Sequence, residues 1–294
     1  MKEFKDKVAV ITGAASGIGL GIARRAVKEG MNVVLADIEE DALSQAEEDL
    51  KSSGAEVMSM VTDVSKAEDI EKLAQETIDT FGEVHLLCNN AGVAAPGFLW
   101  ECILSDWEWV IGVNLWGVIH GNRVFIPIML EQGNECHIVN TSSMAGILRG
   151  DPTNGIYSVT KQGVVALSES YRALFAQIGA KVGVSVLCPG VVNTRITSSE
   201  RNRPAEFCGT DYMPSFDRII KNHPELEQLV REAPKIWEAG TSPDQSGDVV
   251  FEAIKNGIFY IFTEAGANWE EGMKNRFDGI WADYNRIKSI LKDL

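Results

Sequence analysis

The chain has 294 residues, of which 45% are hydrophobic and 23% charged, and its formal net charge is −15. This composition is typical of a globular protein with a large core, and the acidic balance argues against nucleic acid or an anionic membrane as a partner. No apolar run approaches the roughly 18–20 residues of a membrane span, and the first residues are not typical of a secretory signal. Scattered cysteines and histidines without ligand spacing favour reduced thiols, no metal site and a cytoplasmic protein.

The first part of the chain alternates short apolar strands with helices. Strands are predicted at 7–12, 32–37, 56–63 and 84–89, and helices at 17–30, 39–53 and 65–82. Serines followed three residues later by Glu, at 65–68 and again at 105–108, predict capping boxes at two helix starts. One strand and one helix recur about every 25–30 residues, which is the pattern of a parallel sheet covered on both faces.

The second part continues this alternation and then departs from it. It predicts helices at 105–130 and 157–179 and from Ser242 onward, with strands at 137–142, 182–188 and 257–262. Residues 195–240 carry four prolines and predict a lid-like insertion of short helices. Residues 266–294 place apolar side chains at helical spacing, which predicts an extra C-terminal helix that needs a surface to cover. We expect a single domain over residues 1–294.

A glycine-rich turn at 12–19 joins the first strand to the first helix. Glycine lets a backbone approach a diphosphate closely, and the helix N-terminus supplies N–H donors and a positive dipole end. Asp37 ends the second strand, near the spacing expected for the acid that binds an adenosine ribose. Its carboxylate would repel a 2′-phosphate, and neither Ala15 nor Ile38 offers a cation. The sequence therefore predicts NAD rather than NADP.

Tyr157 and Lys161 are the candidate acid/base pair. They are four residues apart, so on a helix they lie on one face. A neighbouring ammonium favours phenolate and lowers the pKa of a tyrosine. The same spacing also arises from a half-buried tyrosine beside a solvated lysine, so its meaning depends on what the rest of the chain places around it.

Six motifs in order closely resemble those of the short-chain dehydrogenase/reductase family. They are Thr-Gly-x-x-x-Gly-x-Gly at 12–19, Asn-Asn-Ala-Gly at 89–92, Asn114, Ser143, Tyr-x-x-x-Lys at 157–161 and Pro-Gly at 189–190. The resemblance covers about residues 6 to 262. It implies an α/β Rossmann fold, that is, a doubly wound, mainly parallel seven-stranded sheet with helices on both faces and a cofactor across the carboxyl ends of the strands. It also implies a homo-oligomer, either a tetramer or a dimer.

The resemblance further implies a set of NAD contacts that spans the whole cofactor, from adenine to nicotinamide. These are Gly13, Ala15, Ser16, Gly17, Ile18, Asp37, Ile38, Asp63, Val64, Asn90, Ala91, Gly92, Tyr157, Lys161, Pro189, Gly190, Val192 and Thr194.

Catalysis, on the same resemblance, is a hydride transfer between nicotinamide and a carbinol carbon. Tyr157 is the general base in oxidation and the acid in reduction, and Lys161 favours its phenolate and holds the nicotinamide ribose. Ser143 hydrogen-bonds the substrate oxygen, with the adjacent Ser142 as the alternative. Asn114 lies in the middle of a predicted helix, where either a structural kink or a proton relay through water explains it.

The substrate end is expected in the segments 93–104, 144–156 and 190–240. Their apolar residues favour a hydrophobic or cyclic secondary alcohol or ketone, and they are Phe98, Trp100, Met144, Ile147, Leu148, Ile156, Val191, Phe207, Tyr212, Met213 and Phe216. The sequence departs from the family at 263–266, where Thr-Glu-Ala-Gly replaces an Asp-Gly-Gly-like turn.

The prediction from sequence is thus an NAD-dependent oxidoreductase that acts on a small-molecule alcohol or ketone. Two alternatives stay open. One is an epimerase or dehydratase of the same family that retains its NAD, and the other is a scaffold that senses NAD without turnover.

Overall fold

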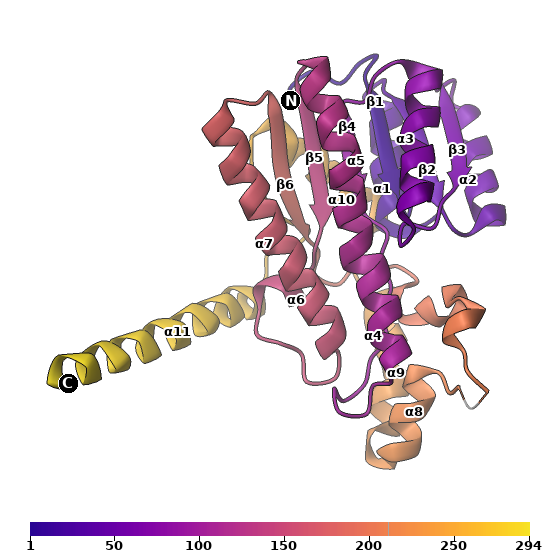
Figure 1. The fold of residues 1–294 in the computed structure, drawn as a ribbon. Helices are drawn as coiled ribbons and strands as arrows, with labels where there is room; N and C mark the ends of the chain where they lie inside the picture. The colour runs from indigo at the N-terminus through magenta and orange to yellow at the C-terminus, as the bar shows by residue number, and fades with distance from the viewer. Residues whose placement is uncertain (211) are drawn as a thin grey trace.

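The computed structural model describes residues 1–210 and 212–294 and contains a parallel seven-stranded sheet in the order β3-β2-β1-β4-β5-β6-β7 (Figure 1). Every neighbouring pair is parallel. The strands are β1 (Val8–Thr12), β2 (Asn32–Asp37), β3 (Val57–Val61), β4 (Leu86–Asn89), β5 (Cys136–Thr141), β6 (Val182–Cys188) and β7 (Tyr260–Phe262). The predicted sheet is confirmed.

Helices cover both faces of the sheet, because its central strands are apolar on both sides. All five residues of β1 and all six of β5 are buried. One face packs against α1 (Gly17–Lys28), α2 (Glu40–Lys51) and α10 (Pro243–Lys255). The other packs against α3 (Ala67–Phe81), α5 (Gly117–Gln132) and α7 (Gly155–Ile178). Strand order reverses beside β1, whose neighbours are β2 and β4, and a ligand crevice is expected at the carboxyl ends there.

Two predicted capping boxes are wrong, because the serines bind other partners. Ser65 lies before α3, and its hydroxyl donates to Asp63 at 2.7 Å. Ser105 lies inside α4 (Leu104–Ile111), where its hydroxyl accepts a hydrogen bond from Arg203 at 3.0 Å. The helix predicted from Ser242 onward is confirmed as α10 (Pro243–Lys255). Ser242 is its N-cap, since its hydroxyl accepts the backbone N–H of the third residue beyond it at 3.1 Å.

The long helix predicted at 105–130 is interrupted. Between α4 and α5 the chain forms a π-helical turn, η1 (Gly112–Trp116), centred on Asn114. Such single turns widen a helix locally and are common at functional sites. The turn carries the Asn114 side chain inward, where it is fully buried.

Short helices fill most of the stretch 195–240, as expected from its prolines. They are η2 (Ile196–Asn202), η3 (Ala205–Phe207), α8 (Ser215–Asn222), η4 (Pro224–Leu226) and α9 (Glu227–Glu238). We call residues 195–240 the lid segment. The last helix, α11 (Ala267–Asp293), extends away from the rest of the molecule in Figure 1. Within the described residues, no helix combines the length and apolar character needed to cross a membrane.

Candidate active site

One cavity of about 490 Å³ lies along the carboxyl ends of the strands and reaches under the lid segment. Except for Ala15 and Asn114, all the residues predicted to bind cofactor or to catalyse line it. These are Gly13, Ser16, Gly17, Ile18, Asp37, Ile38, Asp63, Val64, Asn90, Ala91, Gly92, Ser143, Tyr157, Lys161, Pro189, Gly190, Val192 and Thr194.

The glycine-rich turn is shaped by close backbone approaches. Gly13 has a φ of +65°, and a Cβ atom there would lie 2.8 Å from the Cα of Ala91. A Cβ atom on Gly19 would overlap the carbonyl oxygen of Gly13. The hydroxyl of Thr12 accepts the N–H groups of Asn90 at 2.9 Å and of Ala91 at 3.1 Å. The turns after β1 and β4 therefore form one rigid cradle.

The start of α1 fits the diphosphate of a dinucleotide. Within the described chain, Ser16 at its N-cap makes no side-chain cap bond, and the first turn of α1 carries no acid. Backbone N–H groups at such a start are free to bind an anion, and the helix dipole favours it.

Asp37 braces this turn as well as facing the cavity. One carboxylate oxygen accepts the N–H of Ala15 at 2.9 Å and the other accepts the N–H of Glu39 at 3.1 Å. The N–H of Ala15 is thus engaged by the protein itself, which explains why Ala15 contributes to the shape of the cradle and not to its lining. Each carboxylate oxygen keeps a second acceptor position.

Tyr157 and Lys161 lie one turn apart on α7, as predicted. The Lys161 ammonium donates to the carbonyl of Thr141 at 2.9 Å and lies 5.4 Å from the centroid of the Tyr157 ring. Only 2% of Lys161 is exposed, and burial lowers its pKa to about 8. The lysine therefore reaches past the ring toward the cavity and forms no hydrogen bond with the phenol.

The pKa of Tyr157 differs from the sequence expectation. Burial raises it to about 12, and only the nearby Ser143 side chain opposes that rise. The expected lowering by Lys161 is absent among the described protein groups, because the lysine is itself desolvated and bonded to Thr141.

Ser142 and Ser143 take different directions. The Ser142 hydroxyl donates to the carbonyl of Lys161 at 2.7 Å, and this serine is 1% exposed. Ser143 is the N-cap of the short helix α6 (Met144–Ile147), accepts the N–H of Ala145 at 3.2 Å and lines the cavity together with Tyr157. Ser142 therefore braces α7, whereas Ser143 shares the phenol's environment.

Asn114 lies behind the cavity rather than in its wall. Its side-chain oxygen accepts the N–H of Val93 at 2.8 Å, and its amide donates to the carbonyl of Val93 at 2.9 Å and to Thr160 at 3.3 Å. A Cβ atom on Gly92 would lie 3.5 Å from both the Asn114 oxygen and the Lys161 ammonium. Asn114 thus fixes the loop after β4 against α7.

Two residues of the stretch 263–266, where the sequence differs from the family, support the Pro189–Gly190 turn. The hydroxyl of Thr263 accepts the N–H of Gly190 at 3.2 Å, and Glu264 accepts the N–H of Val191 at 2.8 Å. Glu264 also accepts the indole N–H of Trp269 at 2.9 Å, which ties the turn to α11. The sequence signalled only that this stretch was unusual.

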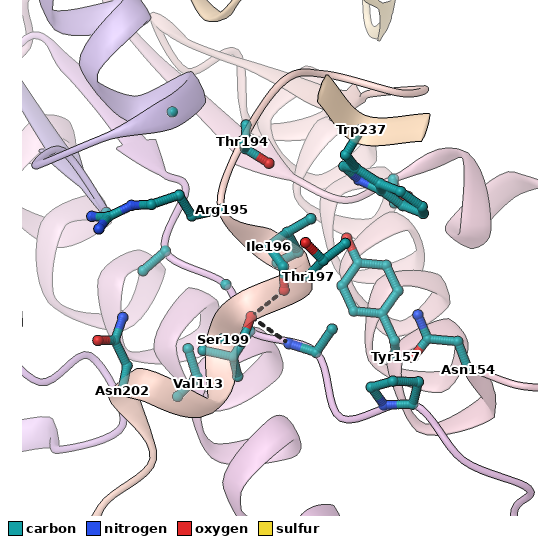
Figure 2. Close-up of a pocket in the computed structure, with 18 of the residues that line it drawn as sticks. Val113, Asn154, Tyr157, Thr194, Arg195, Ile196, Thr197, Ser199, Asn202 and Trp237 are labelled. Carbon is teal, nitrogen blue, oxygen red and sulfur yellow. Dashed lines mark hydrogen bonds between the residues drawn. The ribbon is translucent and has the colours of Figure 1, made fainter. Parts of the chain in front are cut away.

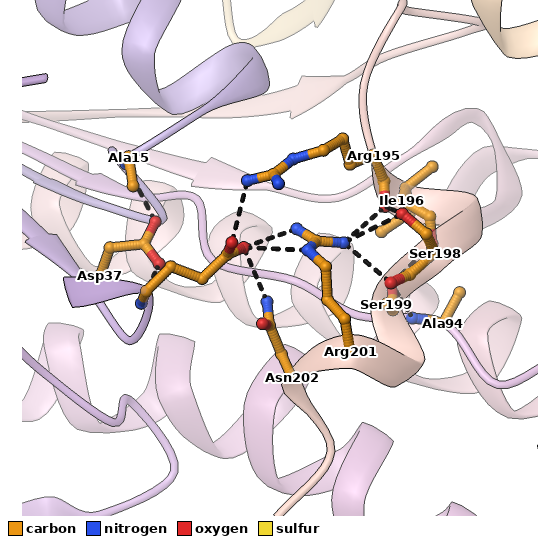
Figure 3. Close-up of polar contacts among 10 residues, drawn as sticks. Ala15, Asp37, Ala94, Arg195, Ile196, Ser198, Ser199, Arg201 and Asn202 are labelled. Atoms are coloured by element: carbon orange, nitrogen blue, oxygen red, sulfur yellow. Dashed lines mark hydrogen bonds and ion pairs between the residues drawn. The ribbon is translucent and has the colours of Figure 1, made fainter. Parts of the chain in front are cut away.

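A clasp of charged residues joins the cofactor side to the lid segment. The carboxylate of Glu39 pairs with Arg195 at 2.9 Å and Arg201 at 2.6 Å and accepts from Asn202 at 3.0 Å (Figure 3). Burial alone would raise the pKa of Glu39, but these partners outweigh it and lower the pKa. Sequence reasoning missed this clasp, because its members are more than 150 residues apart.

A second, buried anchor holds the lid segment to α4. Asp106 is fully buried and pairs with Arg203 at 2.9 Å and also with Arg218. Arg203 packs over the rings of Trp109 and Tyr212, at 5.0 and 4.6 Å from their centroids. Oppositely charged groups in such positions require one another, because an unpaired buried charge is costly.

The apolar end of the cavity is built mainly from the lid segment. Of the substrate-end residues predicted from sequence, Phe216 lines it, and Phe98, Trp100, Met144, Ile147, Leu148, Ile156, Val191, Phe207, Tyr212 and Met213 do not. Met144, Ile147 and Ile156 are buried in the cores, and Trp100 is 80% exposed. Further apolar residues that were not named from sequence also line the cavity, and all of them except Trp109 and Val113 lie in the predicted segments 93–104 and 190–240. They are Val93, Ala94, Pro96, Trp109, Val113, Ile196, Pro204, Ile219, Leu226, Leu229, Val230, Ala233, Ile236 and Trp237. Figure 2 shows Trp237 and Tyr157 reaching toward the same space.

Five of those missed residues carry a signal in the sequence. Leu229, Val230, Ala233, Ile236 and Trp237 follow helical spacing on α9, so the helix has one apolar side. That side faces the cavity instead of a protein core. Across residues 1–210 and 212–294, no group of three or more His, Cys, Asp or Glu side chains gathers as a metal site.

Comparison with known proteins defines the family. The family model described as short chain dehydrogenase matches residues 7–205. A solved short-chain dehydrogenase/reductase from Burkholderia phymatum in complex with NAD is 41% identical, with a TM-score of 0.89, and the match covers 96% of this chain and 97% of that one. The chain belongs to the short-chain dehydrogenase/reductase family and is an oxidoreductase of that family.

Relatives with assigned roles agree with this class. A CLA biosynthesis dehydrogenase/reductase of Lactiplantibacillus plantarum is 33% identical over 91% of each chain. A 1-deoxy-11-beta-hydroxypentalenate dehydrogenase of Streptomyces avermitilis is 33% identical over 97% of this chain and 94% of the relative.

Proposed function

We propose that this protein is an NAD-dependent dehydrogenase or carbonyl reductase that interconverts an apolar secondary alcohol and its ketone. The observation that carries the proposal is the convergence of Ser143, Tyr157 and Lys161 on the same cavity as the glycine turn and Asp37. A redox site needs the dinucleotide cradle and a proton-transfer group to meet at one place, and here they do.

Bound NAD would supply the hydride acceptor at its nicotinamide ring. The glycine turn and the start of α1 would hold its diphosphate, and Asp37 its adenosine ribose. Lys161 would bind the nicotinamide ribose, because its ammonium is aimed at the cavity and anchored only through Thr141. The turn at 189–190, with Val192 and Thr194, would border the nicotinamide.

Tyr157 would take the hydroxyl proton in oxidation and return it in reduction. Ser143 supports this assignment, since it lines the same cavity as Tyr157, where its hydroxyl could bind the substrate oxygen. Asn114 would act through Val93 and Thr160 by holding the loop and α7 together, which makes it a positioning residue.

The substrate is proposed to be hydrophobic or cyclic because the far end of the cavity is apolar. Leu229, Ile236 and Trp237 line it from α9, and Val113 lines it from η1. A relative that acts on a hydroxypentalenate is consistent with an apolar alcohol.

The decisive experiment replaces the proton-transfer group. Tyr157→Phe should lower turnover by about 10²–10⁴-fold with a panel of apolar secondary alcohols, and NAD binding should be retained. Tyr171→Phe on the same helix is the matched control and should keep wild-type rates. Lys161→Met should weaken both turnover and NAD binding. Wild-type-like turnover in Tyr157→Phe would rule out the assignment.

The pH dependence tests the same group. The reacting form in oxidation is the phenolate, so kcat/KM for oxidation should rise about tenfold per pH unit below the Tyr157 pKa of the cofactor complex. The kcat/KM for reduction should instead fall as pH rises through the Tyr157 pKa, because reduction consumes the protonated phenol. A flat oxidation profile would contradict a tyrosine base.

The cofactor preference has its own test. Asp37→Ser removes the charge that would repel a 2′-phosphate, so the ratio of NAD to NADP efficiency should fall. An unchanged ratio would show that another group selects the cofactor.

A further inference from the structure

The first turns of α11 dock on their own subunit. Trp269 and Met273 pack against the core on the α7 face of the sheet, and Arg276 donates to the carbonyl of Ile147 at 2.6 Å. Arg149 in turn donates to the carbonyl of Asn275 at 3.0 Å. These contacts fix the direction in which the helix leaves the body.

Beyond these turns, residues 277–294, here called the arm, extend away from the rest of the molecule (Figure 1). Their large apolar side chains are exposed. Each large apolar side chain of the arm is between 53% and 96% exposed, and they are Phe277, Ile280, Trp281, Tyr284, Ile287, Ile290, Leu291 and Leu294. Scattered exposed apolar residues are ordinary, but a contiguous row on one helix marks an interaction surface.

The spacing of this row identifies the kind of partner. Steps of four and three residues alternate without a break through Met273, Phe277, Ile280, Tyr284, Ile287, Leu291 and Leu294. This is a heptad repeat with a mean period of about 3.5 residues, which stays on one face only when two helices wind around each other. A helix that covers a sheet or a globular core needs no such regularity.

The size of the surface matches a stable contact between subunits. A half-exposed large apolar side chain offers on the order of 100 Å² of accessible surface, so the eight side chains offer about 800 Å² together. One partner of a stable complex typically buries about this area. Most helical stability in proteins comes from packing of an amphipathic face, so a partner along this row would stabilise the arm.

We infer that the arm pairs with the arm of a second copy of this chain as an antiparallel two-stranded coiled coil. Antiparallel pairing places Phe277 opposite Leu294, Ile280 opposite Leu291 and Tyr284 opposite Ile287, so the row matches itself throughout. Parallel pairing brings two bodies together at one end. At that end the side chain of Met273 already packs against the core of its own subunit, so it is not available to a parallel partner.

The flanking residues suit this register. Trp281 of one arm lies beside Lys288 of the other, twice by symmetry, and an ammonium over an indole face is attractive. Asp283 lies beside Ile290 of the other arm, so the pairing opposes no like charges across the seam.

The first test breaks the row in the full chain. Ile280→Glu combined with Ile287→Glu should halve the mass of the assembly measured by sedimentation or light scattering. Ala282→Glu combined with Ser289→Glu adds the same charges to the opposite side of the helix and should keep the wild-type mass. A wild-type mass in the first variant overturns the proposal.

The second test reads the pairing directly by disulfide formation, with the exposed Cys208 replaced by Ser. Mixing a chain with Ile280→Cys and a chain with Leu291→Cys should give a cross-linked dimer, because a disulfide needs Cα atoms within about 7 Å. Neither chain should cross-link alone, and Ser289→Cys should not cross-link with Leu291→Cys.

Two results would overturn the antiparallel arrangement. Cross-linking of either chain alone would show parallel pairing. A halved mass in the first test without any cross-link in the mixture would show that the arm covers the body of another subunit instead of its arm.

Discussion

The turns at 12–19 and 89–92, which are proposed to hold the cofactor, and the lid segment line the same cavity, yet they are held in different ways. The turns at 12–19 and 89–92 are fixed by backbone hydrogen bonds, one hydroxyl and close contacts of glycine. The lid segment is held by charged side chains, with Glu39 at one edge and Asp106 at the other. One wall of the site is therefore built by backbone packing and the other by ion pairs.

This difference should affect which wall moves and how each wall responds to ionic strength. Backbone cradles tolerate no added atoms and respond little to salt. Ion pairs that join distant segments can open and close, and the exposed ones weaken as ionic strength rises. We expect the cofactor wall to stay in place while the lid segment opens for substrate.

The largest effect is expected at the buried anchor of the lid segment. Asp106→Asn removes the nearer counter-charge of buried Arg203 and leaves only Glu200 at 3.5 Å, so the loss should approach about 3–5 kcal/mol. Amide exchange should become much faster in the lid segment and stay unchanged in β1 and β4. Asp217→Asn removes an exposed charge on α8 and serves as the control. Equal protection in both variants would show that the anchor does not hold the lid segment.

A smaller effect is expected from crowding the cofactor cradle. Gly19→Ala pushes a methyl group against the carbonyl of Gly13, so NAD affinity should fall by about 10–100-fold, as for an overpacked core. Gly150→Ala adds the same atom where nothing lies within 4 Å and should leave affinity unchanged. Titration calorimetry measures both, and unchanged affinity in Gly19→Ala would mean that the cradle yields.

The smallest effect is expected at the clasp. Glu39 is 20% exposed, so Glu39→Gln should speed exchange in η2 by only about fivefold, or about 1 kcal/mol. Added salt should speed exchange in the wild type and not in the variant, and Glu40→Gln is the control. Because the pKa of Glu39 is lowered, the clasp is complete above its ordinary value of 4.5 and is lost as pH falls below it. Salt sensitivity in Glu39→Gln would contradict the clasp.

The wall formed by these turns, which is proposed to hold the cofactor, could be located from sequence because its determinants are local. Gly13, Asp37 and Lys161 lie in short motifs at strand or helix ends, and the strand order brings those ends together. The glycine spacing that identifies the turn in the sequence is the same spacing that the close backbone contacts of the turn require.

The lid segment was less predictable, for a physical reason. Its helices and the apolar side of α9 follow local rules, but its attachment depends on pairs such as Glu39 with Arg201, whose residues are 162 apart. Charges at that separation leave no pattern in one sequence. Asn114 is an intermediate case, since its odd position in a helix was visible and its bonds to Val93 were not.

The attachment of α11 has a practical consequence for anyone who modifies the C-terminal region. Trp269 braces the turn at Pro189–Gly190 through Glu264, and Arg276 binds the end of the short helix that Ser143 begins. Deleting the whole helix would therefore disturb two borders of the reaction chamber, whereas removing only residues 277–294 would spare both. Shortened variants of this enzyme should be cut after Arg276, and their kinetics then compared with the full-length chain.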